Sequence, residues 1–128
     1  MRKSETVVNF NTRQTKVVKT RPIISEPLES TITADIMKRL RAFGGVWSKI
    51  HGGPMQTTGL PDIVGCYRGR FVGFEVKRPS TRNNVSGRQR FMLSILKDAG
   101  AITGVVVSAH EAITILKDEF NLKTPEKL

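Results

Sequence analysis

The chain has 128 residues, with 21 lysines and arginines against 11 aspartates and glutamates, and a formal net charge of +10. Such a length fits one domain of roughly 100–200 residues. No stretch approaches the roughly 20 apolar residues of a membrane-spanning helix, so no membrane partner is expected. The single cysteine, Cys66, excludes an internal disulfide. It is expected as a small buried apolar side chain, and a reducing, cytoplasmic location is predicted.

The positive charge is concentrated in the middle of the chain. Residues 68–90 contain seven basic groups and one acidic group, whereas residues 91–128 contain four basic and five acidic groups. Basic clusters gain affinity for nucleic acid by releasing counterions from its phosphates. A polyanionic partner, DNA above all, is therefore favoured over the alternative that the charge serves solubility alone.

The chain is expected to divide into three parts. Residues 1–28 form a basic N-terminal arm and linker, residues 29–120 a folded domain, and residues 121–128 a tail that frays. The domain is expected to begin with a helix from about residue 29, because apolar side chains recur at every fourth position from Ile32 to Leu40.

Three strands are predicted to follow this helix. A pair of glycines ends the helix, and the alternation of apolar and polar residues over 46–50 is typical of a half-buried strand. Residues 62–67 and 70–77 predict two further strands. Because only Arg68 and Gly69 separate these two strands, they are expected to form a hairpin with a type I′ turn.

The last part of the domain is predicted as helix, strand and helix. Ser86 begins a helix and forms a capping box with Gln89, residues 102–107 are a β-branched strand, and Ser108 begins a final helix to about residue 120. The order α-β-β-β-α-β-α indicates an α/β fold, with a mixed central sheet flanked by helices.

The predicted hairpin brings two carboxylates together. With the turn at residues 68–69, Asp62 lies opposite Glu75, and the alternation of side chains places Lys77 on the same face as Glu75. Like charges facing each other in apolar strands are destabilising, and a divalent cation removes the conflict. Two carboxylates, a backbone carbonyl and waters are the oxygen ligands that Mg²⁺ or Mn²⁺ prefers.

Lys77 makes this group resemble a catalytic site more than a simple metal site. A cation beside the metal can orient a water molecule and stabilise charge that develops on a phosphate, which together suit phosphodiester hydrolysis. The alternative is an exposed ion pair, with Asp62 capping the start of its strand, because the pattern Glu-x-Lys is common.

The residues around this group resemble the PD-(D/E)XK nuclease motif, and within that superfamily the VRR-NUC (virus-type replication-repair nuclease) family. The resemblance rests on GLPDI at 59–63, FEVK at 74–77 and SGRQ at 86–89, with Glu29 matching the glutamate of the family's first helix. It covers about residues 29–110 and implies a restriction-endonuclease-like αβββαβ core.

The resemblance also implies roles for individual residues. Asp62 and Glu75 are expected as metal ligands, the main-chain carbonyl of Val76 as a third ligand, and Lys77 as the group that positions the attacking water. Gln89 is expected beside the site, although its capping box explains it equally well.

Other polar residues are weaker candidates. Glu29 is a candidate outer metal ligand, for which Asp35 is an acidic alternative. Lys49, on a strand beside the glycine-rich loop, is a candidate phosphate contact or a solvated lysine, and His51 in that loop is a weaker candidate still. The basic side chains that follow Lys77 are expected to contact the DNA backbone without reading sequence; they are Arg78, Arg82, Arg88 and Arg90.

The resemblance thus implies a Mg²⁺- or Mn²⁺-dependent DNA endonuclease of viral or phage replication and repair. It suggests a structure-selective substrate, such as a branched duplex or a four-way (Holliday) junction. A homodimer is expected, because cutting a symmetric branch needs two sites. The alternatives are a non-catalytic DNA-binding module on the nuclease fold and a sequence-specific restriction-type endonuclease.

Overall fold

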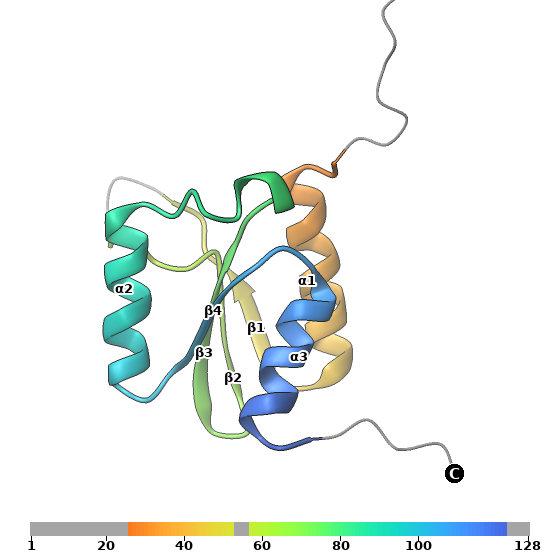
Figure 1. Ribbon diagram of the computed structural model, residues 1–128. Coiled ribbons are helices and arrows are strands. Elements are labelled where there is room, and N and C mark those ends of the chain that lie inside the picture. Colours follow the sequence, from red (N-terminus) through yellow and green to blue (C-terminus); the bar gives the residue numbers. More distant parts are fainter. Residues whose placement is uncertain (1–25, 53–56, 123–128) are drawn as a thin grey trace, which may run out of the picture.

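The computed structural model describes residues 26–52 and 57–122, so the predicted arm up to residue 25 and most of the predicted tail lie outside the described residues. The described part contains a four-stranded sheet with helices on both sides (Figure 1). The predicted element order is confirmed. The elements are α1 (Glu29–Phe43), β1 (Val46–Lys49), β2 (Ile63–Tyr67), β3 (Arg70–Val76), the 3₁₀ turn η1 (Pro79–Thr81), α2 (Gly87–Asp98), β4 (Ile102–Val106) and α3 (Ala109–Glu119).

The strands lie in the order β1-β2-β3-β4, and the sheet is mixed. β1, β2 and β3 are antiparallel, whereas β4 runs parallel to β3 after the crossover through α2. Arg68 and Gly69 both have positive φ, at 49° and 84°, as a type I′ turn requires. The turn sets the pairing of Ile63 with Phe74, which is the register expected from the sequence.

The main core lies between the sheet and the helix pair α1 and α3, which cover the same face (Figure 1). Trp47 packs against Phe74, with ring centroids 6.4 Å apart, and the Trp47 indole N–H donates to the Gly44 carbonyl at 2.7 Å. The strand residues pointing to this face alternate with those pointing away, which is why one face collects the large apolar side chains. Its fully buried members include Ile36, Leu40, Ile63, Val72, Phe74, Val106 and Leu116.

On the opposite face, α2 is the one helix of the described residues that packs on the sheet, over β3 and β4 (Figure 1). No residue of α2 is buried, and Phe91 and Ile95 are 64% and 40% exposed. Cys66, which points to this face, is exposed as well. The prediction of a buried Cys66 is therefore wrong, because α2 lies over the other half of the sheet and leaves β1 and β2 open.

None of the helices within residues 26–52 and 57–122 is long and apolar enough to cross a membrane.

Candidate active site

Asp62 is the residue immediately before β2, and the chain holds it from two sides. The amide of Ile50, which follows β1, donates to the Asp62 carbonyl at 2.8 Å. The Asp62 carboxylate accepts from the amide of Val76 at 2.7 Å. The preceding Pro61 is buried over Gly73, where an added Cβ would come within 2.8 Å of the proline ring. Asp62 is therefore fixed against the end of β3.

Glu75 lies beside Asp62 and is only 2% exposed. One carboxylate oxygen, Oε2, accepts from Gln89 Nε2 at 2.6 Å and lies 3.9 Å from Lys77 Nζ. The other oxygen, Oε1, is buried and has no hydrogen-bond partner within the described part of the chain. The neighbouring Asp62 carboxylate is itself an acceptor, so the two can share a hydrogen bond only when one of them carries a proton.

The surroundings of Glu75 disfavour its charged form. Burial is the largest cause, followed by the negative charge of Asp62 and a hydrogen bond with Asp62. Together they raise the pKa of Glu75 to about 8, although the positive charge of Lys77 acts to lower it. Without a cation, Glu75 is thus mostly protonated at neutral pH. A carboxyl group held in this state, next to a second carboxylate, is typical of functional sites more than of structural ion pairs.

Gln89 performs both of the roles that the sequence left open. The side-chain oxygen Oε1 of Gln89 accepts from the backbone amide of Ser86 at 3.0 Å. The backbone amide of Gln89 donates to Ser86 Oγ at 3.1 Å, which completes the capping box of α2. Its Nε2 then donates to Glu75. The cap fixes the rotamer of Gln89, so the first turn of α2 is tied directly to the buried carboxyl group.

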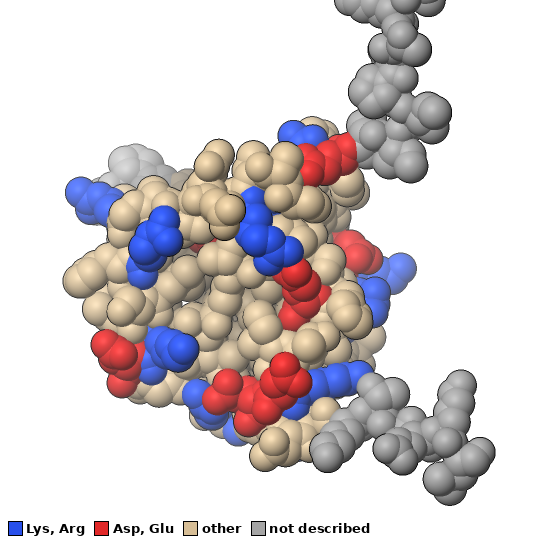
Figure 2. Space-filling model, in the orientation of Figure 1, with Lys and Arg blue, Asp and Glu red and all other residues tan. Residues whose placement is uncertain are grey.

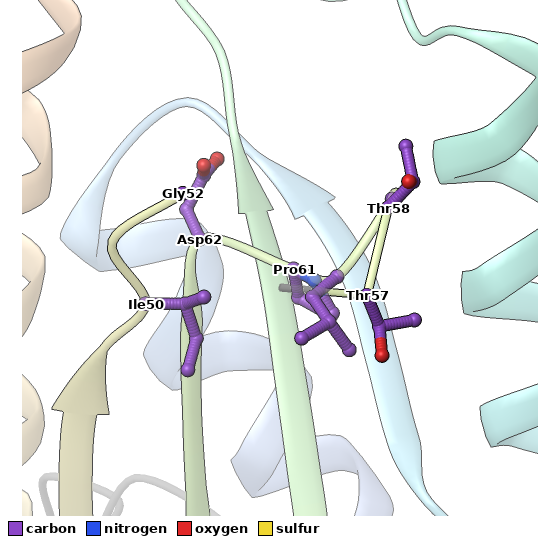
Figure 3. Close-up of a pocket in the computed structure, with 8 residues that line it drawn as sticks. Ile50, Gly52, Thr57, Thr58, Pro61 and Asp62 are labelled. Atoms are coloured by element: carbon purple, nitrogen blue, oxygen red, sulfur yellow. The ribbon is translucent and has the colours of Figure 1, made fainter. Parts of the chain in front are cut away.

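The loop before Asp62 and the segment after β1 line a pocket of about 280 Å³, to which Asp62 also contributes (Figure 3). Gly59 lets this loop approach α2 closely: its φ is 87°, and an added Cβ would lie 2.7 Å from the carbonyl oxygen of Arg88. The pocket gives a ligand access to Asp62, which is partly buried. Its lining consists of Ile50, Gly52, Thr57, Thr58, Gly59, Leu60, Pro61 and Asp62.

The donor set fits one divalent cation. When Glu75 is ionised, its buried Oε1 has no donor among the described residues and needs a positive partner, and Asp62 supplies a second carboxylate. Within residues 26–52 and 57–122, however, no three His, Cys, Asp or Glu side chains are grouped closely enough to hold a metal ion. Glu29 is exposed and acts on Glu75 through its charge, so its role as an outer ligand stays a prediction.

Three of the four arginines expected to contact DNA already have partners in the chain: Arg90 donates to the Val85 carbonyl at 3.0 Å, and the other two pair with carboxylates. Arg78 donates to the carbonyls of Pro27 and Glu26 at 3.0 and 3.1 Å, and also pairs with the Glu26 carboxylate. Arg82 forms two hydrogen bonds with Glu111, at 3.2 and 2.6 Å. A phosphate would have to compete with these carboxylates for either arginine.

The remaining candidates for DNA contact, Lys49, Arg88 and Arg90, are exposed. Figure 2 shows the face of the molecule on which α2, β4 and α3 lie, and acidic and basic side chains lie next to one another there. That face is therefore not uniformly basic, although the whole chain is.

Sequence analysis missed two features that shape the site. Glu26 accepts from the amide and the hydroxyl of Ser80, both at 2.6 Å, and so ties the entry of α1 to the turn after Lys77. Gly73 accommodates Pro61 and thereby fixes Asp62. Gly73 interrupts an otherwise large-residue strand, which is a signal for close approach of another chain segment. No comparable local signal marks Glu26.

No protein-family model matches this chain, and no curated protein matches its sequence.

Proposed function

We propose that this protein is a metal-dependent DNA endonuclease with a restriction-endonuclease-like core. The observation that carries the proposal is the Glu75 carboxyl group, which is 2% exposed, lacks a partner for one oxygen and lies beside both Asp62 and Lys77. Burying the Glu75 carboxyl group beside the Asp62 carboxylate lowers stability unless a cation joins them. Asp62 also lines a pocket, which favours a functional reason for that cost.

Each residue of the site has a separate proposed role in this reaction. Asp62, Glu75 and the main-chain carbonyl of Val76 would hold one Mg²⁺ or Mn²⁺. When bound, such an ion polarises a phosphodiester and lowers the pKa of water. Lys77, whose ammonium group is 3.9 Å from Glu75, orients the attacking water and stabilises negative charge on the phosphate. Gln89 keeps Glu75 in place from the first turn of α2.

DNA is the proposed substrate because of the net charge of +10. A branched duplex in viral replication or repair is the proposed target, with a homodimer supplying two sites and the host cytoplasm as the location. This part of the proposal rests on the resemblance of the 59–63 and 74–77 segments to the VRR-NUC motifs.

A second function is favoured by one observation. The site offers two carboxylates where a third acid was expected, since Glu29 stands outside the group. A non-catalytic DNA-binding module that kept the nuclease fold would not need a third acidic residue. The two functions differ in whether the bound DNA is cut.

The test compares cleavage and binding in the same variants. The full chain is incubated with labelled four-way junction, flap, single-stranded and duplex DNA, in Mg²⁺ and in Mn²⁺. Lys77→Ala is expected to lower the cleavage rate by at least about 100-fold while the Kd for DNA stays within a few-fold. Lys97→Ala, which removes an exposed lysine at the end of α2, is the matched control and should cleave normally.

Two results would overturn the nuclease proposal. If the wild-type chain binds DNA but cuts none of the four substrates with either metal, the non-catalytic module is correct. If Lys77→Ala cuts as fast as Lys97→Ala, the chemistry takes place elsewhere. Cleavage at one discrete sequence of the linear duplex would keep the enzyme but replace the branched target by a restriction-type substrate.

A further inference from the structure

A second hollow lies between α1 and the edge strand β1, outside the candidate active site. It has a volume of about 510 Å³. Three side chains that can donate to an anion line it, namely Arg41 from α1, Lys49 from β1 and His51 just after β1. No carboxylate is among its lining residues, the others being Ala34, Met37 and Ser48.

The secondary structure explains why these side chains converge. Ala34, Met37 and Arg41 are spaced three and four apart, so they share one face of α1. Lys49 is the last residue of β1 and His51 follows two positions later, and both line the hollow. β1 is the first strand of the sheet and has no neighbour on its outer side among the described strands, which leaves the hollow open to solvent.

The cationic groups of the hollow are available to a ligand. Arg41, Lys49 and His51 are all exposed. Neither Arg41 nor Lys49 forms an ion pair within residues 26–52 and 57–122, in contrast to Arg70, Arg78 and Arg82, each of which has a carboxylate partner. Uncompensated cations around a concave surface without acids make a site for an anion.

The hollow is also close to the candidate active site along the backbone. Lys49 pairs with Ile63, the residue directly after Asp62, and the amide of Ile50 donates to the Asp62 carbonyl. Lys49 and His51 are the residues on either side of Ile50. Lys49, opposite the core residue Ile63, points to the other face of the sheet from Asp62 and Glu75. A strand of nucleic acid with one phosphate at these carboxylates reaches the cations by passing round the end of β1.

We infer that this hollow binds a backbone phosphate of the nucleic acid, next to the phosphate at the active site, through Arg41 and Lys49. The inference rests on the proposed function for the identity of the ligand as DNA. The contact is to the phosphate and carries no base recognition. It supplies a phosphate contact that Arg78 and Arg82, already paired in the chain, do not.

A matched control exists on the other side of α1. A pocket between α1 and α3 is also lined by an arginine, a lysine and a histidine, namely Arg39, Lys117 and His110, but it contains Asp118 as well. The pair Arg39→Ala/Lys117→Ala removes the same charge as Arg41→Ala/Lys49→Ala, so the two double variants differ only in where the charge is lost.

The experiment measures binding of a fluorescein-labelled DNA duplex by anisotropy, without divalent cation, over a series of salt concentrations. For Arg41→Ala/Lys49→Ala, the slope of log affinity against log salt should fall by about 0.9 per lost phosphate contact, and the affinity at low salt should drop. The control pair should keep the wild-type slope. Thermal unfolding of both variants verifies that they are folded.

The outcome is independent of whether the protein cuts DNA, because no divalent cation is present. An equal change of slope in both pairs would overturn the inference, since it would show a response to net charge alone. No change in either pair would also overturn it. Where the wild-type chain is active, the Arg41→Ala/Lys49→Ala variant should show a raised KM with a nearly unchanged kcat, because the lost contact is uniform binding.

Discussion

The two faces of the sheet differ in how they are covered. The core that stabilises the fold lies on one face, and the candidate active site lies on the other. The face toward α1 and α3 holds the fully buried side chains, including Phe74, Ile36 and Leu116. The face toward α2 has no buried residue on its helix and leaves Phe91 and Ile95 exposed. The paired carboxyl groups lie on this second face. The packing of the α1 and α3 face can offset the destabilising effect of the carboxyl pair, which lies on the α2 face where a ligand would bind.

The largest expected effect concerns packing. Phe74→Ala removes a fully buried ring from the core face and should lower the free energy of unfolding by about 3–5 kcal/mol. Phe91→Ala removes the same ring from a position that is 64% exposed and should change it by no more than about 0.5 kcal/mol. Urea unfolding followed by circular dichroism measures both. Equal losses in the two variants would show that the α2 face is packed as tightly as the core, against the comparison drawn above.

A smaller effect is expected from the charge of Glu75. Because folding raises its pKa from 4.5 to about 8, the folded state binds a proton more tightly than the unfolded state does. The stability that this proton contributes is fully present below about pH 4.5 and is lost as the pH rises through about 8. Its magnitude is on the order of a few kcal/mol.

The variant Glu75→Gln isolates this contribution, because its amide stays neutral at every pH. In the absence of divalent cations, the wild-type chain should lose stability between pH 5 and 9 relative to Glu75→Gln. Denaturant unfolding of both proteins across that range measures the difference. Parallel pH profiles would mean that Glu75 is ionised in the folded protein, and the view of a strained carboxyl pair would have to be abandoned.

The sequence was sufficient to predict the architecture and the pairing at the site. The short link at Arg68 and Gly69 determines the register of β2 and β3, and the register places Asp62 opposite Glu75. Both signals are local, and so is the capping box of Ser86 and Gln89. The capping box alone did not reveal that the side-chain nitrogen Nε2 of Gln89 donates a hydrogen bond to Glu75.

Contacts between distant segments were beyond prediction from the sequence. Arg78 was expected to face DNA, but it binds the segment that enters α1, more than fifty residues earlier in the chain. The exposure of Cys66 likewise depends on where α2 lies over the sheet, and the apolar pattern of α2 does not specify this position. Local periodicity determines which face of an element is apolar, whereas the partner of that face depends on tertiary packing.

The most direct test of the account is the binding of Mn²⁺ to the full chain by isothermal titration calorimetry at pH 7.5. We predict that the wild-type protein binds one ion and that Asp62→Asn and Glu75→Gln each weaken this binding by more than about 10-fold. Asp98→Asn, a substitution at the far end of α2, should bind as the wild type does. A wild-type chain that binds no Mn²⁺, or Asp62 and Glu75 variants that bind it equally well, would contradict the shared cation on which the proposed function depends.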